Sequence, residues 1–337
     1  MDDVERRALA WVDASGLCPD EASRAVAVAS NSAEFYARFA PAADPERLWV
    51  AACWVYWGFV FDDARCDEGP FAADPAAFAA LAGSVQRALE VPGPLRTGDR
   101  YAAALHDLGE HMRACAGPVQ CRRFHHAHRA WLGGVQWQIG NRAAGRMPDL
   151  DEYLAMRLHA AGGEPTYALL EIANGIDVPA AEMDSPAVLA LTEMAMLVAS
   201  LDNDRHSYAR ETGLGQTGQN IVTVLMAQDG LAPGRALREA IALRDAILDR
   251  FLALRAEILP RAGAALRRYL EDLGHGIRGN IEWGLRVPRY AGPVGAGPSP
   301  VRARVPAQLP WARRPLRGGR DPRRLPSIAW WWRDPAF

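Results

Sequence analysis

The sequence predicts an all-α protein that folds as a single helical domain. Stretches rich in Ala, Leu, Arg and Glu follow one another, and Gly or Pro residues separate most of them, as is typical of helices joined by short connections. The alternation of β-branched and polar residues that a sheet requires is missing. With 337 residues, half of them apolar, the chain is long enough to bury one large core.

The expected helices begin with residues 46–66, a nearly uninterrupted apolar segment that stops at Gly69-Pro70. A helix that is apolar on all sides is a buried helix, so we expect this one in the core. Further helices are expected at residues 101–115, 120–142, 149–161, 164–174, 185–211, 219–228, 234–257 and 262–283.

The composition changes after Tyr290. Residues 291–337 hold much of the chain's Pro together with many Arg and Gly residues, and they end in the run WWWRDPAF. This composition predicts a C-terminal tail that is largely disordered, so the globular domain is expected to span residues 1–290. The alternative is that the Trp run, residues 330–332, anchors the tail onto that domain.

Charge and targeting signals exclude several classes of function. The net charge is −2, which gives no indication of nucleic acid as a partner. The N-terminal residues lack the apolar core of a signal peptide, and no apolar run reaches the roughly 20 residues of a membrane span. Five cysteines without CxxC spacing indicate reduced thiols. We therefore expect a soluble, cytoplasmic protein without a membrane span.

Four carboxylates follow directly on the apolar segment, namely Asp62, Asp63, Asp67 and Glu68. At the C-terminal end of a helix the macrodipole disfavours acidic groups by about 0.3–1 kcal/mol each, and crowded carboxylates also repel one another. A divalent cation would relieve both effects, and oxygen ligands suit Mg²⁺. A solvated helix end explains the same residues equally well, so this cluster alone leaves both interpretations open.

A second row of oxygen donors consists of Asn203, Ser207 and Glu211 in the segment NDRHSYARE. Residues four apart on an α-helix differ by only about 40°, so the three side chains share one narrow stripe. An amide oxygen, a hydroxyl and a carboxylate form a hard ligand set for a cation such as Mg²⁺. The row follows an apolar run, and in an antiparallel bundle it can meet the acidic cluster at one mouth of a central apolar cavity.

With these two motifs, the sequence resembles a bacterial class I terpene synthase. Asp62-Asp63-Ala-Arg-Cys-Asp67-Glu68 is similar to the aspartate-rich motif of that family, and the Asn203–Glu211 segment matches its N-D-x-x-S-x-x-x-E motif. The resemblance spans residues 45–290 and implies a helical bundle around a central apolar cavity, with residues 1–290 as the catalytic domain. It also implies that Asp62, Asp67, Asn203, Ser207 and Glu211 bind Mg²⁺, with three ions expected.

The resemblance further implies the residues that bind the diphosphate. Arg157 lies 46 positions before Asn203 (203 − 157), where the family has its diphosphate-sensing arginine. Arg289-Tyr290 matches the C-terminal Arg-Tyr pair of the family, and Arg210 occupies the place of a diphosphate-binding cation. Every basic residue of the chain is Arg, and a guanidinium binds phosphate through two hydrogen bonds.

The implied reaction is the ionisation and cyclisation of a linear prenyl diphosphate, with farnesyl diphosphate as the expected substrate and geranylgeranyl diphosphate as the alternative. Aromatic faces would stabilise the carbocation, and Phe59 and Trp283 are the candidates for the cavity wall. Gly162 or Gly163, shortly after Arg157, is expected to supply a flexible backbone there. The run HHAH, which holds His125, His126 and His128, is expected on a solvated helix face.

Three other functions compete with this interpretation. A chain-elongating prenyltransferase would need a second aspartate-rich motif where this chain has the Asn203 row. An all-α metal-dependent pyrophosphohydrolase would need paired E-x-x-E rows and a wet pocket, which the aromatic segment before Asp62 does not favour. A non-catalytic helical scaffold would not need the ligand row. A homodimer is compatible with the sequence, although no pattern indicates one.

Overall fold

Helices account for most of the residues that the computed structural model describes, which are 2–67, 69–213, 218–288, 312, 314–333 and 335. The α-helices are α1 (Asp2–Ala14), α2 (Glu21–Ala29), α3 (Ser32–Phe39), α4 (Pro45–Phe61), α5 (Pro75–Glu90), α6 (Arg100–Cys115), α7 (Pro118–Ala143), α8 (Leu150–Ala160), α9 (Gly163–Asn174), α10 (Ala180–Met183), α11 (Pro186–Gly213), α12 (Ile221–Asp229), α13 (Pro233–Ile258) and α14 (Ala264–Gly284). Strands are absent from these described residues, so the predicted all-α fold is confirmed.

Helix starts follow the capping chemistry of the sequence. The side chains of Asp44, Asp74 and Asp99 accept hydrogen bonds from the first backbone N–H groups of α4, α5 and α6. Pro45 and Pro75 occupy first-turn positions where no N–H is needed. Helices α1, α2, α3 and α5 were not expected from the sequence. The start of α5, Asp74-Pro75, nevertheless has the same signal as the start of α4, Asp44-Pro45.

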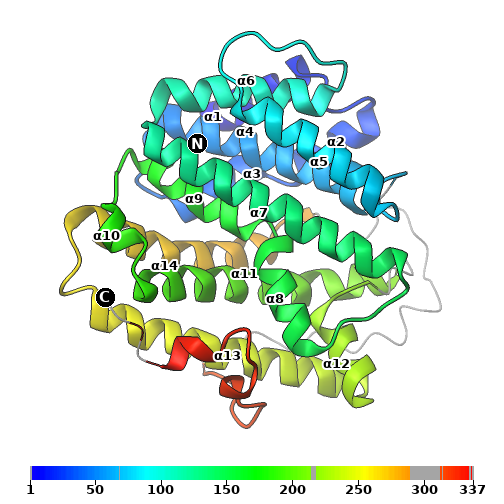
Figure 1. Cartoon of the computed structure of the whole chain (residues 1–337), viewed down its shortest axis with the longest axis vertical. Helices are drawn as coiled ribbons and strands as arrows, with labels where there is room; N and C mark the ends of the chain where they lie inside the picture. Colours follow the sequence, from blue (N-terminus) through cyan, green and yellow to red (C-terminus); the bar gives the residue numbers. More distant parts are fainter. Residues whose placement is uncertain are drawn as a thin grey trace.

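The helices pack side by side in layers (Figure 1), and α4 lies at the centre of the N-terminal half. It packs against α1, α3, α6 and α9, and most of its side chains are buried. In the C-terminal half α11 packs against α13 and α14, and α9 contacts both α4 and α11. The two helices that carry the predicted ligand motifs are thus held on either side of one shared interior.

The C-terminal tail differs from the expected disorder over residues 314–333. This stretch contains two short 3-10 turns, Pro322–Arg324 and Ala329–Trp332, and Figure 1 shows it lying against α13. Trp331 is fully buried, and its indole N–H donates to Glu193 of α11 at 2.8 Å. Burying a large aromatic side chain contributes about 2–3 kcal/mol, which helps to hold this Pro- and Arg-rich stretch on the bundle. Residues 291–311 lie outside the described part of the chain.

Further bonds connect the tail to the bundle. Ser327 donates from its backbone N–H and its hydroxyl to Asp151 of α8, at 2.9 and 2.7 Å. Arg250 of α13 donates to the carbonyl of Trp331 at 2.8 Å. The described part of the tail therefore joins α8, α11 and α13, so it extends the domain beyond residue 290.

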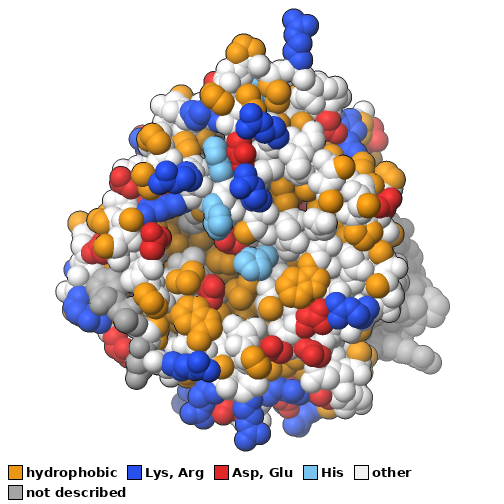
Figure 2. Space-filling view, viewed as in Figure 1, with side chains coloured by type: hydrophobic (Ala, Val, Ile, Leu, Met, Phe, Trp, Pro, Cys, Tyr) orange, Lys and Arg blue, Asp and Glu red, His pale blue; other side chains and the backbone are white. Residues whose placement is uncertain are grey.

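On the face shown in Figure 2, acidic and basic side chains are interspersed, in keeping with the small net charge. None of the helices in the described ranges combines the length and the apolar character that crossing a membrane would require.

Candidate active site

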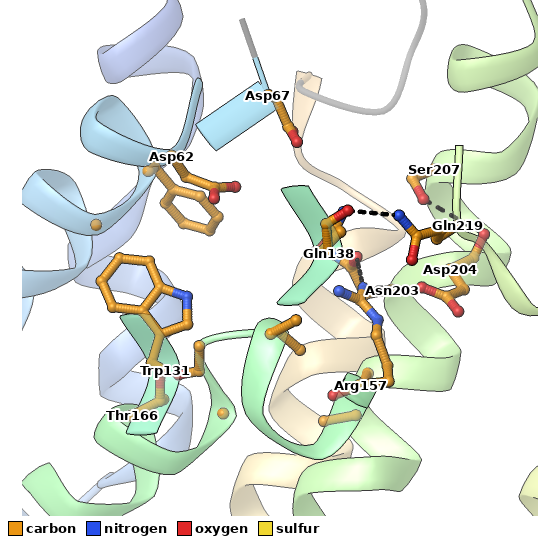
Figure 3. A pocket seen from close by; sticks show the side chains of 18 of the residues that line it. Asp62, Asp67, Trp131, Gln138, Arg157, Thr166, Asn203, Asp204, Ser207 and Gln219 are labelled. Atoms are coloured by element: carbon orange, nitrogen blue, oxygen red, sulfur yellow. Dashed lines mark hydrogen bonds and ion pairs between the residues drawn. The ribbon is translucent and has the colours of Figure 1, made fainter. Parts of the chain in front are cut away.

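A cavity of about 630 Å³ opens between α4, α7, α8, α9, α11 and α14, and both ligand rows line it. Figure 3 shows Asp62 and Asp67 on one side and Asn203 and Ser207 on the other. Most of the residues predicted from the sequence line this cavity, namely Phe59, Asp62, Asp67, Arg157, Gly162, Asn203, Ser207, Glu211 and Trp283. Glu68, Arg289, Tyr290 and the side chain of Arg210 lie outside the described part of the structure.

The acidic cluster lies on a π-helical segment, Asp62–Asp67, that continues α4 without a break. In a π-helix the backbone hydrogen bonds join residues five apart, so residues i and i+5 come to lie on nearly the same face. On an α-helix five positions turn the side chain by about 500°, or roughly 140° away from the first. The π geometry therefore explains how Asp62 and Asp67 both line the cavity although three residues separate Asp63 from Asp67.

Arg142 of α7 holds the end of the π segment in place. One of its guanidinium nitrogens donates to the backbone carbonyls of Cys66 and Ala72, at 2.9 and 2.8 Å. The other lies 3.5 Å from a carboxylate oxygen of Asp67, whose side chain is 46% exposed. The π segment is thus tied through its backbone, whereas the Asp67 carboxylate keeps contact with solvent and can change partner.

The α11 row lies in a more enclosed setting. Arg157 of α8 donates to the amide oxygen of Asn203 at 3.0 Å and forms an ion pair of 2.8 Å with Asp204. Asp204 is almost fully buried, and its second oxygen accepts from the Tyr153 hydroxyl and from the backbone N–H of Ile221. Burial alone would lower the pKa of Arg157, but Asp204, Tyr153 and Glu211 together raise that pKa above the ordinary value.

Glu211, the last member of the row, is hydrogen-bonded rather than solvated. The side-chain amide of Asn220 donates to it at 3.1 Å, and the Ser207 hydroxyl also bonds to it. Burial raises the pKa of Glu211, and the bond from Ser207 opposes that rise. Asn220 also donates to the backbone carbonyl of Asp204 at 2.9 Å, so the loop before α12 supports the ligand helix.

The rest of the cavity wall is aromatic and apolar. Phe59 and Trp283, the two candidates from the sequence, stack with ring centroids 5.7 Å apart, and Phe35 packs edge-on against Trp283 at 4.9 Å. Trp54 and Trp131 also line the cavity, with centroids 6.0 Å apart. Aromatic faces attract cations, so this wall is suited to positive charge on a hydrocarbon.

Gly162 stands where the backbone turns from α8 into α9. Its φ is +71°, in the left-handed region that favours glycine, and a Cβ there would lie 3.7 Å from the Trp131 indole nitrogen. The predicted need for glycine at this turn is therefore explained by backbone conformation at the cavity wall.

One histidine of the HHAH run does not lie on the solvated helix face that the sequence predicted. His128 is fully buried and bonds through Nδ1 to the Gln86 side-chain oxygen at 2.8 Å. Its ring packs among Trp54, Trp57 and Trp131, so burial lowers its pKa to about 3. The sequence held a signal for this, because Phe124, His128 and Trp131 recur at helical spacing on one face of α7.

Two site residues were not identified as functional from the sequence. Asp204 has no role assigned from the sequence beyond its place after Asn203 in the second motif, and Arg142 belongs to neither motif. The signal for Asp204 is its position one residue after a ligand on a buried helix, where a carboxylate requires a cationic partner. Arg142 has no comparable local signal, because its bonds join residues more than 65 positions apart.

The donor chemistry of both rows fits a divalent cation of the Mg²⁺ class. Carboxylate, amide and hydroxyl oxygens are hard ligands, and the described cavity lining offers them without a thiol or imidazole. Three or more His, Cys, Asp or Glu side chains do not converge into one cluster anywhere in the described ranges. This is consistent with Mg²⁺, which is held by one or two carboxylates while substrate phosphates complete its coordination.

Comparison with known proteins assigns the class. Residues 53–250 match the family model described as terpene synthase family 2, C-terminal metal binding. The chain therefore belongs to the terpene synthases: it is a bacterial class I enzyme of this family, a lyase that cyclises a prenyl diphosphate, and its matched domain binds divalent metal.

Individual relatives cover nearly the whole chain. Spiroviolene synthase of Streptomyces violens is 53% identical over 98% of this chain and 92% of its own length. (+)-T-muurolol synthase ((2E,6E)-farnesyl diphosphate cyclizing) of Streptomyces clavuligerus is 32% identical over 98% of this chain and 78% of its own. The crystal structure of SVS_A2, a protein from ancestral sequence reconstruction, superposes with a TM-score of 0.87 at 52% identity, covering 99% of this chain and 94% of that one.

Proposed function

We propose that this chain cyclises geranylgeranyl diphosphate in a Mg²⁺-dependent reaction that releases diphosphate and a cyclic terpene. The observation that carries the proposal is a single cavity with two rows of oxygen donors at its mouth and an aromatic wall beyond them. The rows suit the metal-bound diphosphate, and the aromatic wall suits the hydrocarbon cation.

The cavity volume is compatible with the longer substrate. At roughly 30 Å³ per non-hydrogen atom, the share that a water molecule takes in the liquid, a C20 chain occupies roughly 600 Å³ and a C15 chain roughly 450 Å³. The cavity of about 630 Å³, which includes the mouth between the ligand rows, is large enough to hold the longer chain and also holds the shorter one. Farnesyl diphosphate is the second candidate, because a relative that is 32% identical is named for cyclising it.

Roles for the polar residues follow from their positions. Asp62 and Asp67 on one side, and Asn203, Ser207 and Glu211 on the other, would hold Mg²⁺, with three ions as the family resemblance implies. Bound Mg²⁺ would neutralise charge on the leaving diphosphate and so lower the barrier to ionisation. Arg157 would bind the diphosphate by a charge-assisted hydrogen bond, and the resemblance assigns the same task to Arg210, Arg289 and Tyr290.

The apolar residues would act after ionisation. Phe59, Trp283, Trp54 and Trp131 would exclude water and face the migrating positive charge. Removal of water matters because an exposed allylic cation would be captured before it cyclised. Gly162 would let the backbone take the left-handed conformation that joins α8 to α9 beside this wall.

The proposal is tested by incubating the purified chain with Mg²⁺ and, separately, with C10, C15 and C20 prenyl diphosphates. Products are identified by gas chromatography–mass spectrometry, and diphosphate release is measured in parallel. The expected result is a cyclic product from the C20 substrate at a kcat/KM at least about tenfold above that for C15. A cyclic product from the C15 substrate alone would establish the second candidate instead, and release of diphosphate without any cyclic product would contradict both.

A further inference from the structure

Three polar side chains from three helices line the cavity together with the apolar wall. They are Thr166 of α9, Ser200 of α11 and Asn280 of α14, which we call the acceptor patch. Each is at most 8% exposed. Figure 3 shows Thr166 beside Trp131, on the side of the cavity away from Ser207 and Gln219. Thr166 thus lies apart from the ligand rows at the mouth, and Ser200 and Asn280 belong to neither row.

The two hydroxyl protons of the patch are used in hydrogen bonds to backbone carbonyls, and Asn280 donates one of its N–H groups in the same way. The Thr166 hydroxyl donates to the carbonyl of Gly162, and the Ser200 hydroxyl donates to that of Met196, both at 2.7 Å. These are bonds to the residue four positions earlier, which serine and threonine commonly make within helices. A hydroxyl whose proton is used in this way has only oxygen lone pairs left to offer.

A hydrogen bond to a backbone carbonyl also orients Asn280. Its side-chain nitrogen donates to the carbonyl of Ala199 at 3.0 Å. A carbonyl accepts hydrogen bonds and cannot donate them, so the Asn280 nitrogen faces Ala199 with one of its two N–H groups, and the amide oxygen is not used by that bond. The three residues thus contribute acceptor oxygens, each fixed by a bond that joins it to a helix backbone.

The side chains of α11 that line the cavity show where the patch lies relative to the predicted metal ligands. Met196, Ser200, Asn203 and Ser207 all line it at helical spacing, and the stripe changes from apolar to ligand-bearing along its length. Ser200 stands between the apolar end and the first predicted ligand. Oriented dipoles in a site without water stabilise charge far more than they would in solution.

We propose that the acceptor patch selects the product of this enzyme, by stabilising positive charge at the substrate carbon that lies against Thr166, Ser200 and Asn280. The inference rests on the proposed cyclase function and adds specificity-determining residues to it. Because their oxygens are fixed before the reaction, they favour one cation over its isomers without giving up a proton. Competing pathways respond exponentially to such differences, so small changes at the patch alter product ratios strongly.

A matched pair of substitutions at Thr166 separates polarity from shape. Thr166→Val keeps the shape and removes the oxygen, whereas Thr166→Ser keeps the oxygen and removes a methyl group. Folding is expected to survive in both, because the carbonyl of Gly162 also accepts from the backbone N–H of Thr166 at 3.3 Å. Ser200→Ala is a second position at which only the hydroxyl is lost.

The variants are compared with the wild type on its active prenyl diphosphate, with Mg²⁺, for product ratios and for the rate of diphosphate release. The product ratio is the deciding measurement, because residues with a merely structural role would leave it unchanged. Thr166→Val and Ser200→Ala are expected to change the ratio of the main product to its isomers by at least about threefold. Thr166→Ser is expected to restore the wild-type ratio, and the rise in Tm caused by Mg²⁺ and inorganic diphosphate should be unchanged in all three.

The proposal is overturned if Thr166→Val and Ser200→Ala give wild-type ratios, or if Thr166→Ser shifts the ratio as much as Thr166→Val does. If Thr166→Val fails to fold, as judged by circular dichroism, the result for Ser200→Ala decides. A wild-type chain that gives no cyclic product with any prenyl diphosphate would instead refute the proposed function, so the two failures are distinguishable.

Discussion

The two walls that carry the ligand rows are stabilised by different physical means. The wall formed by α4 and α7 is aromatic and apolar, and Trp54, Trp57, Trp131 and the neutral His128 pack beneath the π segment. The wall formed by α8 and α11 contains the buried ion pair of Arg157 with Asp204, and α11 also pairs through Asp202 with Arg244 of α13. The first wall is held by close packing, and the second by charges that must stay paired.

This difference affects how the ligands are positioned. On α11 the ion pair and its hydrogen bonds fix Asn203 in place before any metal arrives. On the π segment the backbone is tied by Arg142, while the Asp67 carboxylate remains half exposed. The α11 row is therefore fixed in advance, whereas the Asp67 carboxylate can adjust. This combination suits a site that must bind and then release a diphosphate.

The largest expected effect comes from breaking the charge pairing of the second wall. Asp204→Asn leaves Arg157 buried without its anionic partner, and such a change costs about 3–5 kcal/mol of unfolding free energy. Asp67→Asn is the matched control, because it removes the same charge from an exposed pair that contributes about 0–1 kcal/mol. Denaturant unfolding measures both. Equal losses would contradict the distinction between the walls.

A smaller effect is expected when the hydrogen bonds from Arg142 to the π segment are removed. Arg142→Gln removes the bonds to the carbonyls of Cys66 and Ala72 and the ion pair of 3.5 Å with Asp67, while every predicted ligand stays in the chain. Loss of such a supporting residue weakens metal affinity by about 10–100-fold. The measurement is the Mg²⁺ concentration that gives half of the Tm rise at fixed inorganic diphosphate. Arg146→Gln, at the same mouth but bonded to Glu152, is the control, and a similar weakening there would show that Arg142 acts through charge alone.

The smallest effect concerns pH and the first wall. The folded pKa of His128, about 3, lies below its unfolded value of about 6.5, so the unfolded chain binds a proton that the folded one does not. The contribution is constant above pH 6.5 and is lost as pH falls toward 3, by about 1.4 kcal/mol per pH unit. Unfolding free energies at pH 6.5 and 5.5 should therefore differ less in His128→Phe than in the wild type. An unchanged difference would mean that His128 is protonated in the fold.

Much of the α-helical framework could be predicted because burial leaves a local pattern. The apolar segment before Asp62 and the apolar run before Asn203 give their helices directly, and helical spacing places Asn203, Ser207 and Glu211 on one stripe. The π segment could not be predicted in this way. Its hydrogen-bond register depends on how Arg142 and the core hold the end of α4, and these are contacts between distant parts of the chain.

The docking of the described tail could be predicted only as an alternative, the anchoring of residues 330–332, for a related reason. Its composition is that of a disordered segment, and the burial of Trp331 depends on acceptors and surfaces supplied by α11 and α13. Ser327 similarly finds its partner, Asp151, 176 positions earlier in the sequence. The Arg157–Asp204 pair is intermediate, because the sequence indicated Arg157 through the family resemblance but gave no sign of which carboxylate it would meet.

The central claim, that the two rows bind one metal–diphosphate complex together, is tested most directly by a double-mutant cycle on Asp62→Ala and Asn203→Ala. The measurement is the Tm rise produced by Mg²⁺ with inorganic diphosphate, alongside turnover of the active prenyl diphosphate. Each single variant is expected to fold, to lose most of the Tm rise and to lose at least about a hundredfold in turnover. The double variant should be scarcely worse than either, because residues that act as one unit are not additive. Fully additive losses, or wild-type turnover in Asn203→Ala, would contradict the claim.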